Sequence, residues 1–478
     1  MKSRYATKEE LLEKAKEAQG KKFKDLDKTG LLSNSKNKGG LGQIIEEGLF
    51  GMPINNRAEP DFAWLGVELK VTPVKLVDNG KRYSAKERLV LCVINYHEEG
   101  HNDCFKNSAA WAKAENMLIV VYLWEKGKDK GEYVILKAFL HEFSEEDLLV
   151  IEKDWKKIHD KIASGHAEDL TEADTDILAA CTKGANGMVF VEQFGSDVKA
   201  KPRAFCLKTA YMSMILRLQL GHPQELLRIF SAQELREYGS YSDILRKRLE
   251  PFVNLRVDEI VEMLGFDYNP NKKDVLAQLT ASMLGVKGMD LSKTLEFQQS
   301  NIHVKTIRLE PNGVPREHMS FGKVDFNALM SDSWEESQFF REFEENKYLL
   351  IVYQYLETAK QNPNRVPVFR GARLWNMPGM VINRYVKQLW KETRAVLKEG
   401  VKLERKGNRV LNNLPGAKQN PVCHLRSKAK DGNDKDRLPD GQEITKQAFW
   451  LNNTYVAKIV SQEEDESRLV MDVVSADK

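Results

Sequence analysis

Three charged side chains stand in an otherwise mostly apolar stretch, PDFAWLGVELKVTP, at residues 60–73. Asp61, Glu68 and Lys70 follow the spacing Asp-x6-Glu-x-Lys. Burying a charge is costly unless it is paired or holds a metal ion. Side chains two residues apart on a strand point to the same face, so Glu68 and Lys70 share a face that Asp61 reaches from the preceding turn. The pattern therefore indicates either a structural salt bridge or an active site whose carboxylates bind Mg²⁺.

The elements that must position these residues follow from the hydrophobic pattern. Short apolar runs predict strands at residues 65–74, 87–96, 117–125 and 131–143, with the first two as neighbours. Caps and helical periodicity predict helices at residues 7–20, 39–51 and 145–165. Residues 202–220 predict a strand or turn that leads into a helix. Glu46 lies in the helix before the charged strand, where its carboxylate is a candidate ligand or a partner for a metal-bound water.

The second half of the sequence repeats the first. Six segments recur in the same order, and the clearest pair is EKDWKKIHDKIASG (152–165) with VKQLWKETRAVLKEG (386–400). Such self-similarity indicates one structural unit used twice. We therefore expect an α/β fold of two tandem modules, each a mixed central sheet flanked by helices. The expected boundaries are residues 1–220 for the first module, 221–240 for a linker and 241–478 for the second module.

The two copies differ at the charged positions. At a separation of 235 residues, the matched pairs are Asp61 with Glu296, Glu68 with His303, Lys70 with Lys305 and Glu46 with Ala281. A salt bridge that the fold needs should persist in both copies, whereas the positions that persist are mostly apolar or aromatic. This difference favours a functional role for the acids of the first copy, and it predicts a second copy that lacks a complete Mg²⁺ site.

Composition is typical of a soluble globular protein, with 42% hydrophobic and 30% charged residues and a net charge of +3. The basic charge is uneven, because residues 402–437 hold ten Lys or Arg against four Asp or Glu. Such a run is either a solvated face or a nucleic-acid contact. The five cysteines are scattered without a CxxC pattern, and no apolar run approaches the ~20 residues that span a bilayer. We expect a cytoplasmic protein with reduced thiols and no membrane partner.

Several motifs of the first half resemble a known family. GLGQIIE, PDFAWLGVELKVTP, CTKGANG and PRAFCLKTAYMSMIL are similar to the MutH family of GATC-specific endonucleases, which have the fold of the PD-(D/E)xK nucleases. The likeness extends over nearly all of residues 1–217. The double-length chain resembles still more closely the type II restriction enzymes that cut GATC with a MutH-like module used twice.

The resemblance implies roles for individual residues. Asp61, Glu68 and Lys70 match the family's catalytic triplet, with Asp61 and Glu68 as metal ligands, while Glu46 matches its helix glutamate and Lys113 a further active-site lysine. Lys183 matches a lysine that contacts bases. This chain has Cys181 where the family has an arginine, and Cys206 where the family has a tyrosine linked to adenine methylation. Discrimination of methylated adenine is therefore not expected here.

Further DNA contacts are predicted from basic residues near these motifs. In the first half the candidates are Lys86 and Arg88, which alternatively mark a solvated strand entrance, together with Lys208. In the second half Arg426 and Lys428 fall where CTKGAN falls in the first, and a solvated loop is the alternative.

Together these features predict a Mg²⁺-dependent type II restriction endonuclease that hydrolyses double-stranded DNA at GATC. The degenerate second module would bind DNA or regulate the first, and a second copy of the chain on DNA is a further candidate partner. One alternative is a GATC nicking endonuclease of the mismatch-repair type. The other is a DNA-binding protein without catalytic activity.

Overall fold

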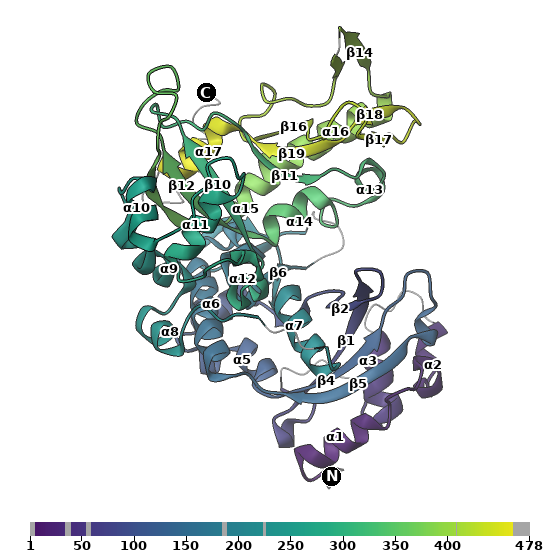
Figure 1. Cartoon of the computed structure of the whole chain (residues 1–478). Helices are drawn as coiled ribbons and strands as arrows, with labels where there is room; N and C mark the ends of the chain where they lie inside the picture. The colour runs from purple at the N-terminus through teal and green to yellow at the C-terminus, as the bar shows by residue number, and fades with distance from the viewer. Residues whose placement is uncertain are drawn as a thin grey trace.

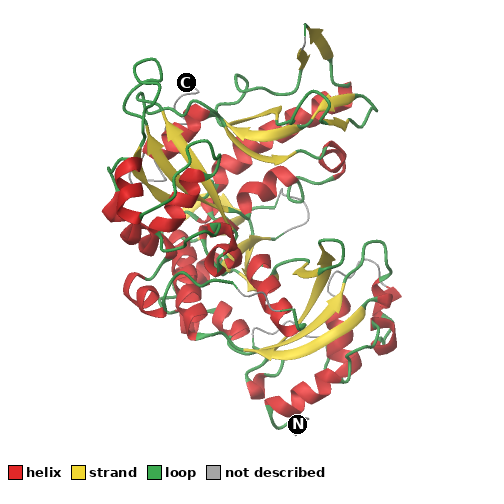
Figure 2. Ribbon diagram, in the orientation of Figure 1, coloured by secondary structure: helices red, strands yellow, loops and turns green. Residues whose placement is uncertain are grey.

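The computed structural model describes residues 5–33, 40–53, 59–183, 189–222, 226–407 and 409–461 of the 478-residue chain. The N-terminal half lies at the bottom and the C-terminal half at the top of Figure 1. Figure 2 shows sheets in both halves with helices packed beside them. The predicted α/β class, with mixed sheets flanked by helices, is confirmed.

The main sheet of the N-terminal half has the strand order β2-β1-β4-β5. Its strands are β1 (Glu68–Val77), β2 (Arg82–Ala85), β4 (Met117–Leu123) and β5 (Val134–His141). β1 and β4 run parallel, and the other neighbours are antiparallel. The apolar run MLIVVYL makes β4 the buried centre of the sheet, since such continuous apolar strands are covered on both faces. The predicted strands at 117–125 and 131–143 are confirmed as β4 and β5, and they pair antiparallel.

A smaller sheet of the same half has the order β3-β9-β6. It consists of β3 (Leu89–Val93), β6 (Leu178–Thr182) and β9 (Arg203–Leu207). The sequence predicted that the strands at 65–74 and 87–96 are neighbours, and this is wrong, because β3 pairs with β9. The edge of β1 is taken instead by β2, and the chain passes into the second sheet after Ala85.

The C-terminal half repeats this pattern of strand pairing. β10 (Ile302–Leu309) is parallel to β12 (Lys347–Gln354), which is antiparallel to β13 (Val368–Trp375). A second sheet has the order β11-β19-β16, formed by β11 (Met319–Lys323), β16 (Cys423–Ser427) and β19 (Gln447–Leu451). The short hairpins are β7 (Val191–Gln193) with β8 (Ser196–Ala200), β14 (Leu403–Lys406) with β15 (Arg409–Asn412), and β17 (Lys435–Arg437) with β18 (Glu443–Thr445).

The helices begin and end largely where sequence signals place them. Thr7 caps α1 (Lys8–Lys16) by accepting a hydrogen bond from the Glu10 N–H, as N-cap threonines do. The other helices of the N-terminal half are α2 (Phe23–Leu26), α3 (Gly40–Ile44), α4 (Tyr96–Gly100), α5 (Ala109–Ala114), α6 (Glu145–Ala163) and α7 (Thr209–Gln219). Those that follow are α8 (Ala232–Tyr238), α9 (Tyr241–Leu249), α10 (Val257–Leu264), α11 (Val275–Met283), α12 (Leu295–Gln299), α13 (Phe326–Ser331), α14 (Gln338–Glu344), α15 (Gly379–Val381), α16 (Lys387–Glu399) and α17 (Asn453–Ser461).

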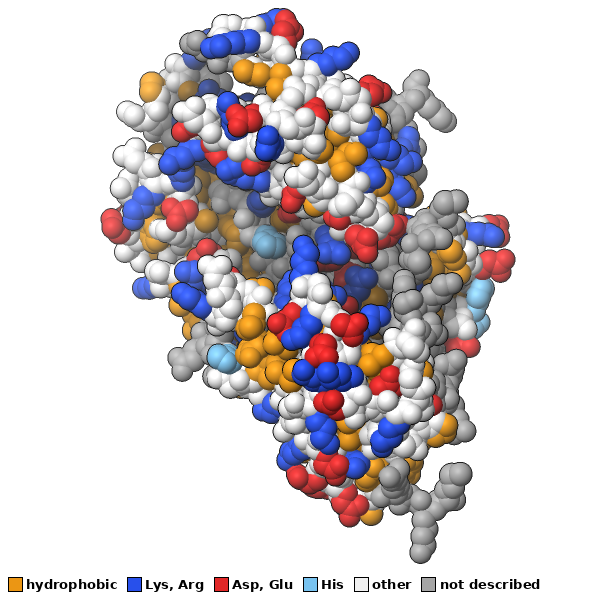
Figure 3. Space-filling model, turned by 90° about the vertical axis from the view of Figure 1, so that its right-hand side faces the viewer, with side chains coloured by type: hydrophobic (Ala, Val, Ile, Leu, Met, Phe, Trp, Pro, Cys, Tyr) orange, Lys and Arg blue, Asp and Glu red, His pale blue; other side chains and the backbone are white. Residues whose placement is uncertain are grey.

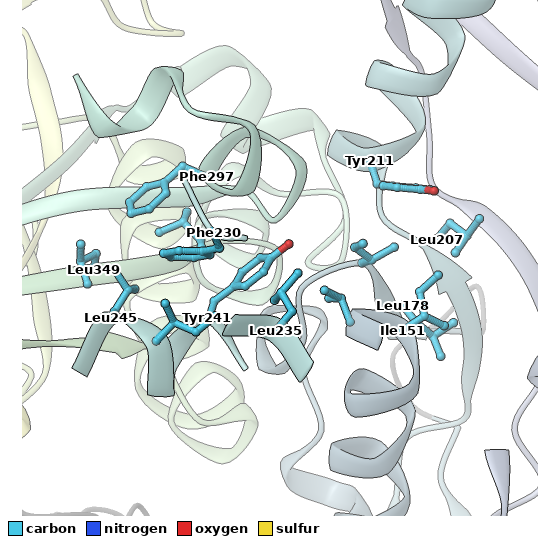
Figure 4. Close-up of a cluster of buried hydrophobic side chains, with 14 of the residues drawn as sticks. Ile151, Leu178, Leu207, Tyr211, Phe230, Leu235, Tyr241, Leu245, Phe297 and Leu349 are labelled. Atoms are coloured by element: carbon cyan, nitrogen blue, oxygen red, sulfur yellow. The ribbon is translucent and has the colours of Figure 1, made fainter. Parts of the chain in front are cut away.

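The two halves share one hydrophobic core. Figure 4 shows Ile151, Leu178, Leu207 and Tyr211 of the N-terminal half in one buried cluster with Phe230, Leu235, Tyr241, Leu245, Phe297 and Leu349. Three of these residues come from or directly border segment 221–240, which the sequence marked as a linker. That segment is therefore packed into the core over its described residues, and it is more than a tether. Within the described residues, no helix is both long and apolar enough to cross a membrane.

Candidate active site

A tight turn brings Asp61 back onto the first residues of β1. The Phe62 N–H donates to the Val67 carbonyl at 2.9 Å and closes a loop over residues 63–65, which form one 3₁₀ turn. Asp61 Oδ2 then accepts from the Leu69 N–H at 3.0 Å. The Asp61 N–H in turn lies 3.3 Å from Glu68 Oε2. The predicted proximity of Asp61 and Glu68 therefore arises from local backbone geometry.

Glu68 is buried between two lysines. It is only 5% exposed, and its Oε1 lies 2.9 Å from Lys70 Nζ on the same face of β1. Its Oε2 lies 2.9 Å from the Nζ of Lys113, which comes from α5. Lys113 also donates to the Glu59 carbonyl at 2.6 Å, and Lys70 to the Leu91 carbonyl of β3 at 3.1 Å. Both ammonium groups are thereby fixed beside one carboxylate.

Glu46 is a third carboxylate, and Asp61 and Glu68 are close enough to affect its charge. Helix α3 continues as a single π-turn, Ile45–Leu49, which carries Glu46. Partial burial, and after it the negative charges of Asp61 and Glu68, raise the pKa of Glu46 to about 7. Burial, and then repulsion by Glu68, also raises the pKa of Asp61. Burial is the main cause of both shifts, and the neighbouring carboxylates add to it.

The donor set fits a hard cation that retains water. The described residues contain no group of three or more His, Cys, Asp or Glu side chains arranged to hold a metal ion. Asp61 and Glu68 remain as a pair of carboxylates, and Mg²⁺ usually takes only one or two protein carboxylates and completes its shell with water and substrate phosphate. Glu68 would have to release part of its lysine contacts to serve as a ligand.

A cleft of about 690 Å³ opens beside Lys70. Its walls on the N-terminal side include Lys86, Arg88 and Lys183, all predicted DNA contacts. On its other side lie residues from the C-terminal half: Glu335, Glu336, Arg341 and Glu345. Figure 3 shows a hollow between the two parts of the molecule in which Lys and Arg side chains gather beside carboxylates. The acidic residues of this wall were not predicted from the sequence, because they lie more than 200 positions from β1.

The predicted DNA contacts of the first half differ in their surroundings. Lys183 is exposed at the end of β6. Lys86 lies over the Trp124 ring at 4.9 Å, and Arg88 forms an ion pair with buried Glu172. Lys208 is only 3% exposed and donates to the Thr175 carbonyl. Burial lowers the pKa of Lys208 to about 8. Lys208 therefore makes a buried contact within the protein, whereas the prediction was an exposed contact with DNA.

The counterpart region in the second half keeps the lysine and lacks the acids. Lys305 Nζ donates to the Ser320 carbonyl of β11 at 2.7 Å, as Lys70 does to β3. His303 stands where β1 has Glu68. Glu296 accepts hydrogen bonds from the Ile229 and Phe230 N–H groups. Its carboxylate therefore holds segment 221–240 in place.

A separate cleft of about 540 Å³ opens beside Lys305 and is lined also by Arg308, Arg316 and Trp450. The guanidinium of Arg426 lies 5.6 Å from the Trp450 ring. Lys428 Nζ donates to the Phe321 carbonyl at 2.8 Å. These two predicted DNA contacts therefore border the second cleft or its neighbouring strand, and other residues line the cleft beside Lys70.

Comparisons with known proteins match this arrangement. The family model of the DNA mismatch repair enzyme MutH matches residues 50–154, the segment that contains Asp61, Glu68, Lys70 and Lys113. The type II restriction enzyme Sau3AI of Staphylococcus aureus is 34% identical over 490 residues, which cover 95% of this chain and 99% of that enzyme. This chain belongs to the Sau3AI family of type II restriction enzymes. It is a site-specific endonuclease.

The restriction enzyme also has repair relatives. The DNA mismatch repair protein MutH of Shewanella sp. strain MR-7 is 31% identical over 189 residues, covering 39% of this chain and 82% of MutH. MutH of Shewanella putrefaciens strain CN-32 is 32% identical over 190 residues, with the same coverage. Restriction enzymes of the PD-(D/E)xK type generally use a divalent metal ion, in agreement with the paired carboxylates Asp61 and Glu68.

Saturating Ca²⁺ is expected to raise the Tm of the restriction enzyme by a few degrees. A cation between Asp61 and Glu68 relieves their repulsion only in the folded state, and a ligand at 100 times its Kd stabilises that state by about 2.7 kcal/mol. Thermal unfolding with and without Ca²⁺ measures the shift. Glu47→Gln, which alters the neighbouring carboxylate, should keep the shift, and Asp61→Asn should lose it. An equal rise in the Asp61→Asn variant would place the cation elsewhere.

Proposed function

We propose that the chain is a Mg²⁺-dependent type II restriction endonuclease that hydrolyses phosphodiester bonds of double-stranded DNA at GATC. The observation that carries the proposal is the assembly of Asp61, Glu68, Lys70 and Lys113 at the start of β1. It lies within the segment that matches MutH, in a chain that is similar over nearly its full length to Sau3AI.

The proposed roles follow from the contacts. Asp61 and Glu68 would hold Mg²⁺, which when bound would supply polarisation and charge neutralisation at the scissile phosphate. Lys70 orients the attacking water or stabilises the charge that develops on the phosphate. Lys113 fixes the position of Glu68 from α5. Glu46, with its raised pKa, is placed to exchange a proton or to hold a water molecule at the edge of the site.

The chain divides in this proposal into a catalytic MutH-like module, residues 1–220, a connecting segment, 221–240, and a second module, 241–478. The repeated order of strand pairing supports the division. The second module lacks the acids, and its cleft beside Lys305 has basic and aromatic walls. Such a surface suits the phosphate backbone of DNA. We assign it DNA binding and regulation, with Arg426 and Lys428 as candidate contacts.

A nicking endonuclease is the second candidate, because each chain holds one complete acidic site and MutH relatives act in mismatch repair. Incubating the full-length enzyme with Mg²⁺ and a plasmid of known sequence separates the possibilities. Linear fragments ending at GATC support the proposal, nicked circles support the second candidate, and unchanged plasmid contradicts both. Faster cutting of a two-site than a one-site plasmid, at equal site concentration, would support a regulatory second module.

Lys183→Ala is expected to weaken binding at GATC by about 1–3 kcal/mol and to leave binding to unrelated sequences nearly unchanged, because a lysine in the major groove donates to guanine O6 and N7. Binding in Ca²⁺ to matched duplexes with and without GATC measures both. Lys199→Ala changes another exposed lysine of the same segment and serves as the control. A uniform loss on all sequences would make Lys183 a phosphate contact.

A further inference from the structure

Side chains from the C-terminal half hold the strand pair that leads to Lys183. Arg203, the first residue of β9, forms an ion pair with Glu344 of α14 at 2.7 Å, and the two side chains are 2% and 0% exposed. Asp176, just before β6, forms an ion pair with Lys347 of β12 at 2.6 Å, with both side chains 4% exposed. The starts of both β6 and β9 are therefore fixed by charges from the other half.

The Arg203 contact lies close to Lys183. Arg203 Nη1 donates both to Glu344 Oε1 and, at 2.6 Å, to the Ala180 carbonyl of β6. Arg203 pairs with Thr182 in the ladder, and the Lys183 N–H donates to the Pro202 carbonyl at 2.8 Å. Only one residue therefore lies between Arg203 and Lys183 on either strand, Thr182 on β6 or Pro202 before β9. A shift of Arg203 would reach Lys183 through that residue.

Stability alone does not account for the ion pair between Arg203 and Glu344. Within the described residues, Arg203 Nε and Glu344 Oε2 are buried without a hydrogen-bond partner. Buried charges with unfilled hydrogen-bonding capacity are costly, and a hydrophobic pair of similar volume is often as stable or more stable. The presence of such a pair is better explained by a need to fix one arrangement of the two halves.

The two halves can be compared at the position of Glu344. In the first half Lys113 precedes Met117 by four positions, and Met117 pairs with Glu68. In the second half Glu344 precedes Tyr348 by four positions, and Tyr348 pairs with His303. Counted back from these paired residues, Glu344 stands at the position of Lys113 with the opposite charge, and it contacts the strand pair of the first half.

We propose that Glu344 and Lys347 are positioning residues that fix β6 and β9, and through them Lys183, so that the C-terminal half sets the sequence discrimination of the catalytic half. This proposal rests on the recognition role proposed for Lys183. It assigns the C-terminal half, which lacks counterparts of Glu46 and Glu68, a direct part in recognition at the first cleft, separate from any DNA that the second cleft binds.

The test compares Glu344→Gln with Glu342→Gln in the full-length enzyme. Glu342 lies on the same helix but accepts from Tyr348 within its own half, so it is a matched control. Binding in Ca²⁺ is measured on a GATC duplex and on the same duplex with one base pair changed, together with Tm. Glu344→Gln should lower the ratio of the two affinities about tenfold, a size typical of coupling between sites. Glu342→Gln should lower Tm and leave the ratio unchanged.

Two further variants test whether contacts from the C-terminal half to β9 position Lys183. Arg203→Gln should lower the ratio as Glu344→Gln does, and the double variant should be no worse than either, because both changes break one contact. If Glu344→Gln fails to fold, Asn383→Ala replaces it, since Asn383 accepts from Lys201 Nζ at 2.9 Å next to β9. Asn383→Ala is then expected to lower the ratio.

The outcomes separate this inference from the proposed function. A wild-type enzyme without preference for GATC would overturn the proposed function itself. A wild type that prefers GATC, with the preference kept in Glu344→Gln and Asn383→Ala, would overturn only the positioning role. An equal change of the ratio in Glu344→Gln and Glu342→Gln would also overturn it, because a general loss of packing would then be the cause.

Discussion

Asp61→Asn is expected to lower the rate of DNA cleavage in Mg²⁺ by about 10³-fold or more. A bound metal ion contributes several kcal/mol of transition-state stabilisation, and each loss of about 1.4 kcal/mol lowers the rate tenfold. Asparagine can still accept the Leu69 N–H bond that Asp61 Oδ2 accepts, so the turn should survive. Single-turnover cleavage of a GATC duplex measures the effect, and binding in Ca²⁺ shows whether DNA affinity is kept.

Glu47→Gln is the matched control for Asp61→Asn. Glu47 neighbours Glu46 but bonds to the Thr29 hydroxyl, so its loss should leave the rate unchanged. Because the second half offers Glu296 and His303 at the matched positions, the Asp61→Asn chain should have no other complete site. Cleavage by Asp61→Asn at near the wild-type rate would contradict both the metal assignment and the inactive second half.

Lys70→Met is expected to lower kcat by about 10²–10³-fold, the cost of removing one group that stabilises developing charge in an active site. Lys70 is held by Glu68 at 2.9 Å and by the Leu91 carbonyl at 3.1 Å, and it lines the cleft where DNA is proposed to bind. Methionine keeps most of the side-chain volume. The measurement is kcat at saturating duplex, which separates catalysis from binding.

Lys305→Met provides a control within the same chain. Lys305 has the same position on β10 and the same kind of carbonyl contact, but it has no adjacent catalytic carboxylate. Its replacement should leave kcat unchanged. A loss of kcat equal to that of Lys70→Met would mean that the second half takes part in the chemistry.

The two halves depend on one shared hydrophobic core. Separating the chain near residue 220 would divide one buried cluster, which contains Leu207 and Tyr211 before that point and Phe230 and Tyr241 after it. It would also leave Arg203 and Asp176 without their ionic partners, and unpaired buried charges are strongly destabilising. Point substitutions in the full-length enzyme are therefore the appropriate tests of what each half contributes.

Much of the local structure of β1 is determined by the sequence. The two-residue period of a strand places Glu68 and Lys70 on one face, and the structure keeps them 2.9 Å apart. Thr7 starts α1 through a local cap. These features depend on backbone geometry over a few residues, which any neighbouring structure leaves intact. Comparison of the two copies likewise identified the acids of the first half, because duplication preserves packing positions more readily than reactive ones.

Tertiary structure alone decided which distant groups meet. Lys113 pairs with Glu68 from 45 positions away, and Arg203 pairs with Glu344 from 141. Lys183 and Lys208 are both lysines next to strands of one sheet, yet the first is exposed and the second is 3% exposed. No local pattern distinguishes them, because burial depends on what the rest of the chain packs against each position. The sequence therefore determined the chemistry of β1, and the packing of the two halves determined which charges serve it.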